Sequence, residues 1–241
     1  MTVIQKLRIP LDITMTALSV ILMGGTVLFP DDKVHQILGM ALLALWAAHI
    51  ALNRKWYGAV SKGKYNPYRI MQTVVNFGIL LCAILLAVSG MMMAWFVPET
   101  VSVPLGFART AHLVGSHWYY IFMCAHLGMH TSVIFSRIKT KRAEAAEARE
   151  GGFDRLNHRR TSVRKIIFRV FVALVCAYGV YAFIERGIAK YMFFRQPFFF
   201  LDLERGYLLF AADYISILVL VATAAHWLGK VLRALDSGRK E

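Results

Sequence analysis

Charged residues and cysteines are scarce in this chain of 241 residues. Only 17% of the positions are charged, whereas soluble domains carry roughly a quarter, and 58% are hydrophobic, with a mean hydropathy of +0.52. The three cysteines each lie inside an apolar run, which argues against a disulfide framework. The sequence also lacks a CxxCH string, a glycine-rich phosphate loop, a nucleophile triad and a thiolate metal site. The lipid bilayer is therefore the expected solvent of this chain.

Six apolar stretches are long enough, or nearly so, to cross a hydrocarbon core, which takes about 20 helical residues. Because an open sheet cannot satisfy its backbone hydrogen bonds in lipid, the predicted fold class is all-α, a polytopic membrane helical bundle of about six transmembrane helices. We expect a four-helix core at residues 1–136, a basic cytoplasmic loop at 137–165 and a C-terminal pair of transmembrane helices at 166–241. The six stretches are Ile13–Phe29, Val34–Leu52, Thr73–Val97, Ala111–Phe135, Ile166–Ile184 and Tyr207–Leu228.

Basic residues are distributed unevenly between the two predicted sides of the membrane. Most of the 28 lysines and arginines lie in the two terminal tails and in the loops after the second and fourth stretches. The positive-inside rule therefore predicts a multi-pass protein of the cytoplasmic membrane with both termini in the cytoplasm. Topology accounts for the net charge of +14, so no nucleic-acid partner is predicted.

Histidine inside a membrane span is costly and rare, so its expected role is functional. Two of the six stretches carry six of the eight histidines: His35 and His49 in the second, and His112, His117, His126 and His130 in the fourth. His35 and His49 are 14 positions apart, as are His112 and His126. Fourteen residues turn through about 1400°, close to four full turns, and rise about 21 Å. Each pair therefore lies on one helix face, with one histidine near each membrane surface.

The second and fourth stretches run in the same direction, which places His35 level with His112 near the outer surface and His49 level with His126 near the inner surface. Low-spin heme iron takes two axial ligands from opposite faces of the macrocycle, and facing helices of a bundle supply them. The spacing thus predicts that the four-helix core binds b-type heme at two bis-histidine sites stacked across the bilayer. These four histidines are the predicted iron ligands.

Small and basic residues accompany the predicted ligands. A flat macrocycle needs small neighbours, and three glycines lie close to the histidines: Gly39, Gly115 and Gly128. Arginines at the span ends are candidate partners of heme propionates, namely Arg109 on the outer side and Arg54 and Arg137 on the inner side.

Several assignments stay open. His130 lies one turn beyond His126 on a similar face and is an alternative inner ligand. His117 lies about 140° from His112 on the helical wheel, so it is expected to support a ligand or to contact another helix. The number of hemes, one or two, also stays open.

Other polar features inside the apolar stretches have two interpretations each. Asp12 and Asp213 would either handle protons at a quinone site or pair with an arginine or a backbone donor. Residues 191–200 are too few to span, and we expect an interfacial segment on the outer face that covers a heme edge or docks a partner.

Two functions from other classes are alternatives. One is a metal or proton transporter in which the histidines line a pathway, and the other is a non-redox membrane anchor subunit whose histidines hold helices together. The paired 14-residue spacing counts against a transporter, because a pathway has no need of two level pairs.

Several motifs occur together in the first half of the chain. They are His49-Ile-Ala-Leu-Asn-Arg-Lys-Trp-Tyr, Lys62-Gly-Lys-Tyr-Asn-Pro-Tyr-Arg and Gln72-Thr-Val-Val-Asn, with Arg109-Thr-Ala-His112, Ser116-His-Trp118 and His126-Leu-Gly-Met-His130. In combination they resemble the flavinylation-associated cytochromes. The resemblance covers about residues 5–135, and residues 199–215 more loosely.

This resemblance implies a small membrane b-type cytochrome that works with extracytoplasmic flavoproteins carrying covalently attached flavin. Such a protein passes electrons between the quinone pool, or a cytoplasmic donor, and a flavin-carrying or heme reductase outside the membrane. The implied cofactor is heme b, in two copies, with a quinone as a further candidate. The residues carried over are His35, His49, His112, His126 and His130, whereas His117 stands where an aromatic is expected in relatives. On its own the chain is expected to be an electron-transfer subunit of an oxidoreductase system rather than a complete enzyme.

Overall fold

The computed structural model describes residues 3–97, 104–147, 155–199 and 206–237, with side chains in 7–97, 104–131, 163–199 and 206–236. Every regular element within these ranges is a helix, which confirms the predicted all-α class for the described chain. The elements are α1 (Val3–Leu22), a short 3-10 turn η1 (Thr26–Leu28), α2 (Asp32–Leu52), α3 (Arg54–Ala59), α4 (Pro67–Met92), α5 (Leu105–Glu147), α6 (Arg155–Glu185), α7 (Ile188–Met192) and α8 (Gly206–Ser237).

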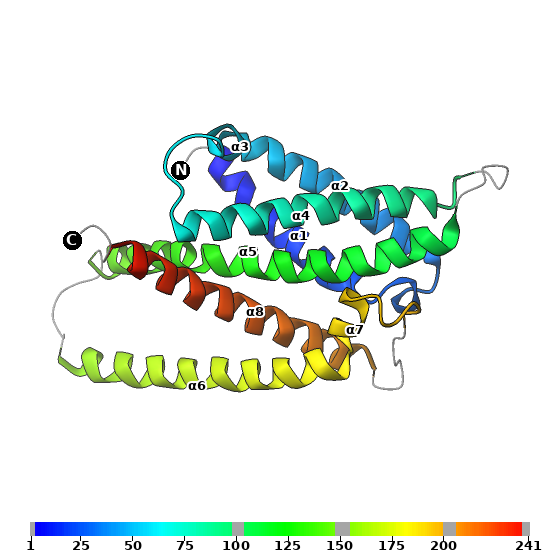
Figure 1. The fold of residues 1–241 in the computed structure, drawn as a ribbon. Coiled ribbons are helices and arrows are strands. Elements are labelled where there is room, and N and C mark those ends of the chain that lie inside the picture. Colours follow the sequence, from blue (N-terminus) through cyan, green and yellow to red (C-terminus); the bar gives the residue numbers. More distant parts are fainter. Residues whose placement is uncertain (1–2, 98–103, 148–154, 200–205, 238–241) are drawn as a thin grey trace.

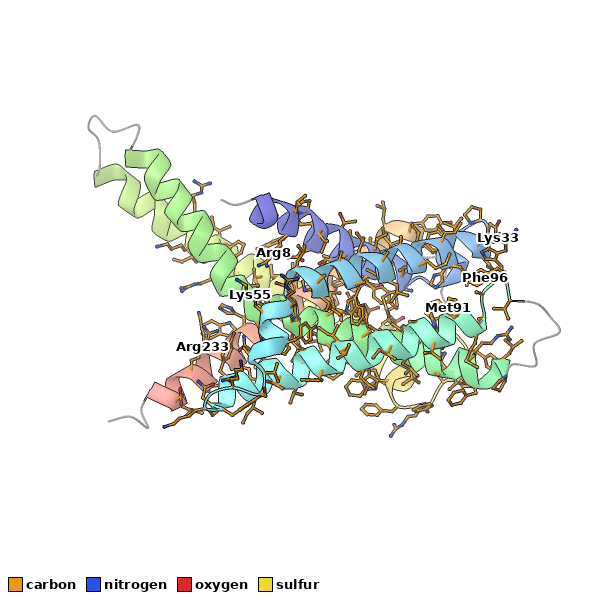
Figure 2. All side chains as sticks on the ribbon, turned by 90° about the horizontal axis from the view of Figure 1, so that it is seen from above. Arg8, Lys33, Lys55, Met91, Phe96 and Arg233 are labelled. Atoms are coloured by element: carbon orange, nitrogen blue, oxygen red, sulfur yellow. The ribbon has the colours of Figure 1, made fainter. Side chains whose placement is uncertain are left out.

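The long helices run back and forth along one common axis (Figure 1). Helix α1 begins and α8 ends at the same end of the bundle, where α3 also lies, whereas η1 and α7 lie at the opposite end. Figure 2 shows Arg8, Lys55 and Arg233 toward the first end, and Lys33 and Phe96 toward the other. Three of the segments that are basic in the sequence therefore meet at one end of the molecule.

Four described helices are long and apolar enough to cross a membrane: α2, α4, the Val163–Glu185 part of α6, and the Gly206–Asp236 part of α8. They correspond to four of the six predicted stretches, so a membrane protein is supported at this coarser level. Helix α1 covers the first stretch as far as Leu22 and α5 covers the fourth, but the described residues of α1 and α5 do not meet the same criterion. For these two helices the membrane crossing stays a prediction.

Several helix ends differ from those that hydropathy suggests. Helix α1 ends at Leu22 rather than Phe29, because Gly24 and Gly25 follow and Gly25 adopts a φ of 62°. Helices α5 and α6 continue into the basic segment 137–165, where Lys, Arg, Ala and Glu favour helix. This basic segment is thus largely helical where it is described.

Helix α5 is central to the bundle and packs against both α4 and α8. Small residues permit the close approach: a Cβ built on Gly128 would lie 2.2 Å from the carbonyl oxygen of Ala222 on α8, and one on Gly78 of α4 would lie 2.7 Å from the ring of Phe122. Small residues at helix interfaces let backbones approach in membranes, where association depends on packing. Helix α2 instead packs chiefly against α1.

Candidate functional site

Histidine rings from α2 and α5 meet at two levels of the bundle. The ring centres of His35 and His112 are 6.2 Å apart, with their planes inclined at 66°. Those of His49 and His126 are 6.3 Å apart and inclined at 74°. One pair lies toward each end of α2, so the structure brings together the partners that the 14-residue spacing predicts.

These distances match the requirements of two imidazoles bound to one metal from opposite sides. With a metal–nitrogen bond of about 2.0 Å and a nitrogen about 1.1 Å from the ring centre, trans imidazoles have ring centres roughly 6.2 Å apart. Stacked rings lie closer, as those of His117 and Tyr191 do at 4.5 Å, whereas rings packed edge to face have centres up to about 7 Å apart. The spacing of each pair therefore agrees with an iron atom between the rings and also with edge-to-face packing of the two rings.

Three of the four rings are oriented through Nδ1 by a polar side chain. The Nδ1 of His49 lies 2.8 Å from the carboxylate of Asp12 on α1, and that of His126 lies 2.8 Å from Oδ1 of Asn76 on α4. Because carboxylate and amide oxygens accept hydrogen bonds, both imidazoles carry their proton on Nδ1. This tautomer leaves the Nε2 lone pair free to bind a metal.

The His35–His112 pair has weaker partners. The Nδ1 of His112 lies 3.1 Å from Oγ of Ser89 on α4. The Nδ1 of His35 is buried and has no hydrogen-bond partner among the described residues. The one side chain that contacts an Nδ1 atom of this pair is therefore neutral, and the carboxylate of Asp32 acts on His35 without contacting its ring.

Helix α2 is covered little by the rest of the protein. It is apolar over 21 residues, yet none of its residues is buried by the protein. A Cβ built on Gly39, one turn from His35, would meet no atom within 4 Å. The imidazole donors, the ring spacing and this open space together fit a macrocycle held by two histidines.

The two remaining histidines of α5 occupy different surroundings. His130 is exposed, and its ring centre lies 4.6 Å from that of His126. His117 is buried, its Nδ1 lies 2.8 Å from the backbone carbonyl of Leu113, and its ring stacks on Tyr191. His117 thus contacts the α7 segment and takes no part in either pair, in agreement with the sequence.

The arginines near the histidine pairs differ in exposure and in their contacts. Arg54 and Arg109, both predicted near propionates, have exposed side chains, and the side chain of Arg137 lies outside the described residues. Arg8 on α1 was not predicted. Its guanidinium donates to the backbone carbonyl of Leu52, and its buried Nε has no partner among the described residues. Arg8 is therefore a better placed cation at the His49 end of α2.

Two of the three glycines expected beside a macrocycle serve helix packing instead. A Cβ on Gly115 would lie 3.2 Å from the side chain of Leu85 on α4, and one on Gly128 would clash with the Ala222 carbonyl. Both glycines face neighbouring helices, so only Gly39 keeps the predicted role. The sequence places these glycines near the histidines but does not say which side of α5 they occupy.

Asp213 has the second of its two predicted roles, pairing with an arginine. The guanidinium of Arg186 donates from Nε to its Oδ2 at 2.8 Å, and Nη2 lies 2.8 Å from the same oxygen as an ion-pair contact. The Tyr178 hydroxyl donates to Oδ1 at 2.5 Å. Both charged side chains are almost fully buried, at 1% and 7% exposure. This ion pair ties α8 to the end of α6.

Residues 191–199 do not span the bundle, as predicted. Tyr191 and Met192 are buried, and the Trp118 indole of α5 donates to the Met192 carbonyl at 3.0 Å. Phe194 and Phe198 point outward and are about two-thirds exposed (67% and 70%). Phe200 lies outside the described residues.

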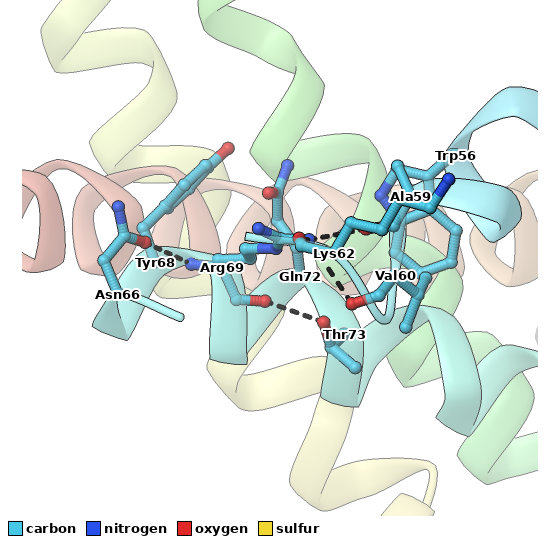
Figure 3. Close-up of a pocket in the computed structure, with 9 residues that line it drawn as sticks. All are labelled: Trp56, Ala59, Val60, Lys62, Asn66, Tyr68, Arg69, Gln72 and Thr73. Atoms are coloured by element: carbon cyan, nitrogen blue, oxygen red, sulfur yellow. Dashed lines mark hydrogen bonds between the residues drawn. The ribbon is translucent and has the colours of Figure 1, made fainter. Parts of the chain in front are cut away.

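A pocket of ≈ 440 Å³ opens where α3 meets the start of α4 (Figure 3). Its walls include the aromatic rings of Trp56 and Tyr68 and the amide of Gln72. Gln72 lies one turn before Asn76, the partner of His126. The pocket therefore lies at the end of the bundle nearer to the His49–His126 pair.

Asn76 and Ser89 were not predicted, although the sequence holds the information to find them. Both are polar residues inside an apolar span. Because α4 and α5 are antiparallel neighbours, Ser89 lies about as far before their connection as His112 lies after it, and Asn76 likewise matches His126. Level polar residues on adjacent helices are candidates to orient the ligands.

No group of three or more His, Cys, Asp or Glu side chains among the described residues is placed to hold a metal ion. Heme iron takes only two axial ligands from the protein, and the two histidine pairs supply that number. Comparison with family models, with curated proteins and with solved structures finds no match. The likeness to the flavinylation-associated cytochromes therefore rests on the motifs of the sequence and stays a prediction.

Proposed function

We propose that this chain is a transmembrane b-type cytochrome that carries two hemes and serves as an electron-transfer subunit. The observation that carries the proposal is the pairing of His35 with His112 and of His49 with His126 at the spacing of two imidazoles on one iron. When bound, heme b supplies reversible one-electron chemistry at iron.

The ligands of the two sites follow from the ring positions. His35 and His112 hold one heme, and His49 and His126 hold the other. His126 is preferred to His130 because its ring meets that of His49 and its Nδ1 is held by Asn76. His130, beside His126 and exposed, is then a neighbour of the site.

The side chains of this protein have three proposed roles: they bind the hemes, orient the ligand rings and exclude water from the sites. Asp12, Asn76 and Ser89 hold the ring planes of three ligands, and Asp12 and Asn76 also hold the tautomer of His49 and His126, which sets the direction of Nε2. The apolar side chains of α2 and α4 exclude water from the sites and so favour electron transfer over side reactions. Arg8 offers its unpartnered Nε to a propionate at the His49 end.

We further propose six membrane spans, with both termini in the cytoplasm and the His49–His126 site on the inner side. The convergence of α1 and α8 at one end of the bundle supports an even number of spans (Figure 1). Electrons then travel between the quinone pool or a cytoplasmic donor and an extracytoplasmic flavoprotein or heme reductase. The pocket of Trp56, Tyr68 and Gln72 suits a quinone head group, because it combines aromatic walls with an amide.

The test is a dithionite-reduced minus oxidised visible spectrum of the purified protein, with a pyridine hemochromogen assay for heme per chain. We expect a b-type spectrum and two hemes per chain. One heme per chain would leave a cytochrome but remove the transmembrane relay. Folded protein that stays colourless after expression with ample heme would overturn the proposal, and divalent-metal binding by that protein would then favour the transporter.

A further inference from the structure

The two histidine pairs differ in the charge of the groups that hold them. Asp12 places a carboxylate oxygen 2.8 Å from Nδ1 of His49, and its charge also acts on His126 and His130. Ser89 offers His112 a hydroxyl, and Nδ1 of His35 has no hydrogen-bond partner among the described residues. The charge of Asp32 acts on His35, but without a contact to its ring. One pair therefore has a carboxylate in direct contact with a ligand ring, whereas the other has none.

The Asp12 side chain is 53% exposed, and a neighbouring contact of α1 holds it close to His49. Arg8 lies one turn earlier on the same face of α1, and its guanidinium donates to the Leu52 carbonyl at the end of α2. Because Leu52 and His49 are three residues apart, the two contacts together set the register of α1 on α2. The Nη2 of Arg8 makes this contact, and among the described residues the ion pair of the Asp12 carboxylate is with His49 and not with Arg8.

A carboxylate that accepts a hydrogen bond from Nδ1 changes the reduction potential of the iron that Nε2 binds. It draws the proton toward itself, makes the imidazole a stronger donor and so favours the more positive, oxidised iron. Its negative charge favours oxidised iron in the same direction. A neutral hydroxyl strengthens the imidazole donor less and adds no negative charge. The charged partner therefore lowers the reduction potential of its own site.

We propose that Asp12 is a positioning residue that holds the His49–His126 site at a lower reduction potential than the His35–His112 site. The inference rests on the proposed function and adds a direction to it. With both hemes bound, the His49–His126 site would give up one electron, its iron changing from ferrous to ferric, and the His35–His112 site would accept it, its iron changing from ferric to ferrous. No bond would form or break and no proton would be transferred. Because an electron passes to the site of higher potential, the transfer would run from the Asp12 end of the bundle toward the η1 end.

The experiment is a potentiometric titration of the heme-loaded protein and of Asp12→Asn, which keeps an acceptor oxygen but removes the charge. We expect the lower of two couples to rise by at least tenfold in its equilibrium constant, which is 59 mV for one electron. The higher couple should stay within about twofold of its wild-type constant. Asp12→Glu, which keeps the charge, should stay near wild type in both couples and controls for a purely structural role.

Two backgrounds identify the couple that moves. In His35→Ala, which retains only the His49–His126 site, Asp12→Asn should shift the remaining couple by the full amount. In His49→Ala, which retains only the other site, Asp12→Asn should shift nothing. Two hemes with an unmoved lower couple, or a shift that appears in the His49→Ala background, would overturn the inference and leave the cytochrome standing. Wild-type protein that binds no heme would overturn the proposed function first, and this inference with it.

Discussion

Helix α5 packs differently on its two sides. Toward α8 the backbones touch, because Gly128 leaves no room for a side chain next to the Ala222 carbonyl. Toward α2 the helices meet through histidine rings whose centres are 6.2 and 6.3 Å apart, and no residue of α2 is buried. In a membrane bundle without a cofactor, close packing of α5 against α2 would be expected as well, because packing drives helix association in membranes. The difference shows that α5 packs tightly on α8 and loosely on α2, and under the proposed function the loosely packed side is the one that holds the site.

The largest expected effect comes from disrupting the closely packed side. Gly128→Leu forces a side chain into the Ala222 backbone, which cannot move as a flexible side chain can, so the cost exceeds the usual 1–3 kcal/mol or so of overpacking. We expect little or no monodisperse protein by size-exclusion chromatography. Gly39→Leu is the matched variant on the α2 side, where nothing lies within 4 Å. It should fold with a wild-type Tm in the absence of heme and bind less heme.

The buried ion pair gives the next largest effect, also confined to the α8 side. Asp213→Asn leaves the Arg186 guanidinium buried without its counter-charge, which costs about 3–5 kcal/mol. We expect a lower Tm with two hemes per chain retained and both potentials unchanged. Loss of heme at an unchanged Tm would contradict the separation of the two sides and would restore proton handling as the role of Asp213.

Removal of single ligands tests the α2 side directly. His112→Ala and His126→Ala should each lose one of two hemes in the hemochromogen assay, because each site needs both imidazoles. Their folding should persist, since the contacts of α5 with α8 do not involve these rings. His117→Phe is the control: it keeps the stacking on Tyr191 and should retain both hemes. Loss of heme in His117→Phe alone would show that the pairs are misassigned.

The sequence predicts the α2 side better than the α8 side, for a physical reason. The pairing of histidines 14 residues apart on two parallel helices can be predicted from the sequence, since helical geometry fixes both the face and the level of each ring. The predicted pairing of His35 with His112 and of His49 with His126 is the pairing that the structure shows. Their role as iron ligands is a separate question that spectra must answer.

Other parts of the site depend on contacts between distant segments. Asp12 reaches His49 only because α1 packs on α2 with Arg8 at Leu52, and hydropathy contains no information on that register. Gly115 and Gly128 are near the histidines in sequence but face other helices, which only the packing of α4 and α8 decides. A contact such as that of Asp12, which depends on the register of two helices, is therefore harder to predict than the pairing of the histidines.

The smallest expected effect concerns Asn76, which orients the His126 ring from α4 and does not itself ligate the iron. Asn76→Leu removes the acceptor that holds the Nδ1 proton of His126, so the ring is free to turn and to exchange tautomers. Loss of such a partner typically lowers metal affinity about 10–100-fold. Heme titration of His35→Ala protein, which retains the His49–His126 site alone, should show a decrease of this size when Asn76→Leu is added.

Thr73→Ala is the matched control for Asn76→Leu, one turn earlier on α4, because the Thr73 hydroxyl donates only to the Arg69 carbonyl of its own helix. It should leave heme affinity unchanged. Ser89→Ala, assayed in His49→Ala protein, should weaken the other site by less than Asn76→Leu weakens its own, since the contact of Ser89 is longer, at 3.1 Å. Equal losses from Asn76→Leu and Thr73→Ala would mean that α4 supports the site only through packing. A loss confined to Asn76→Leu would instead show that α4 orients the His126 ring directly.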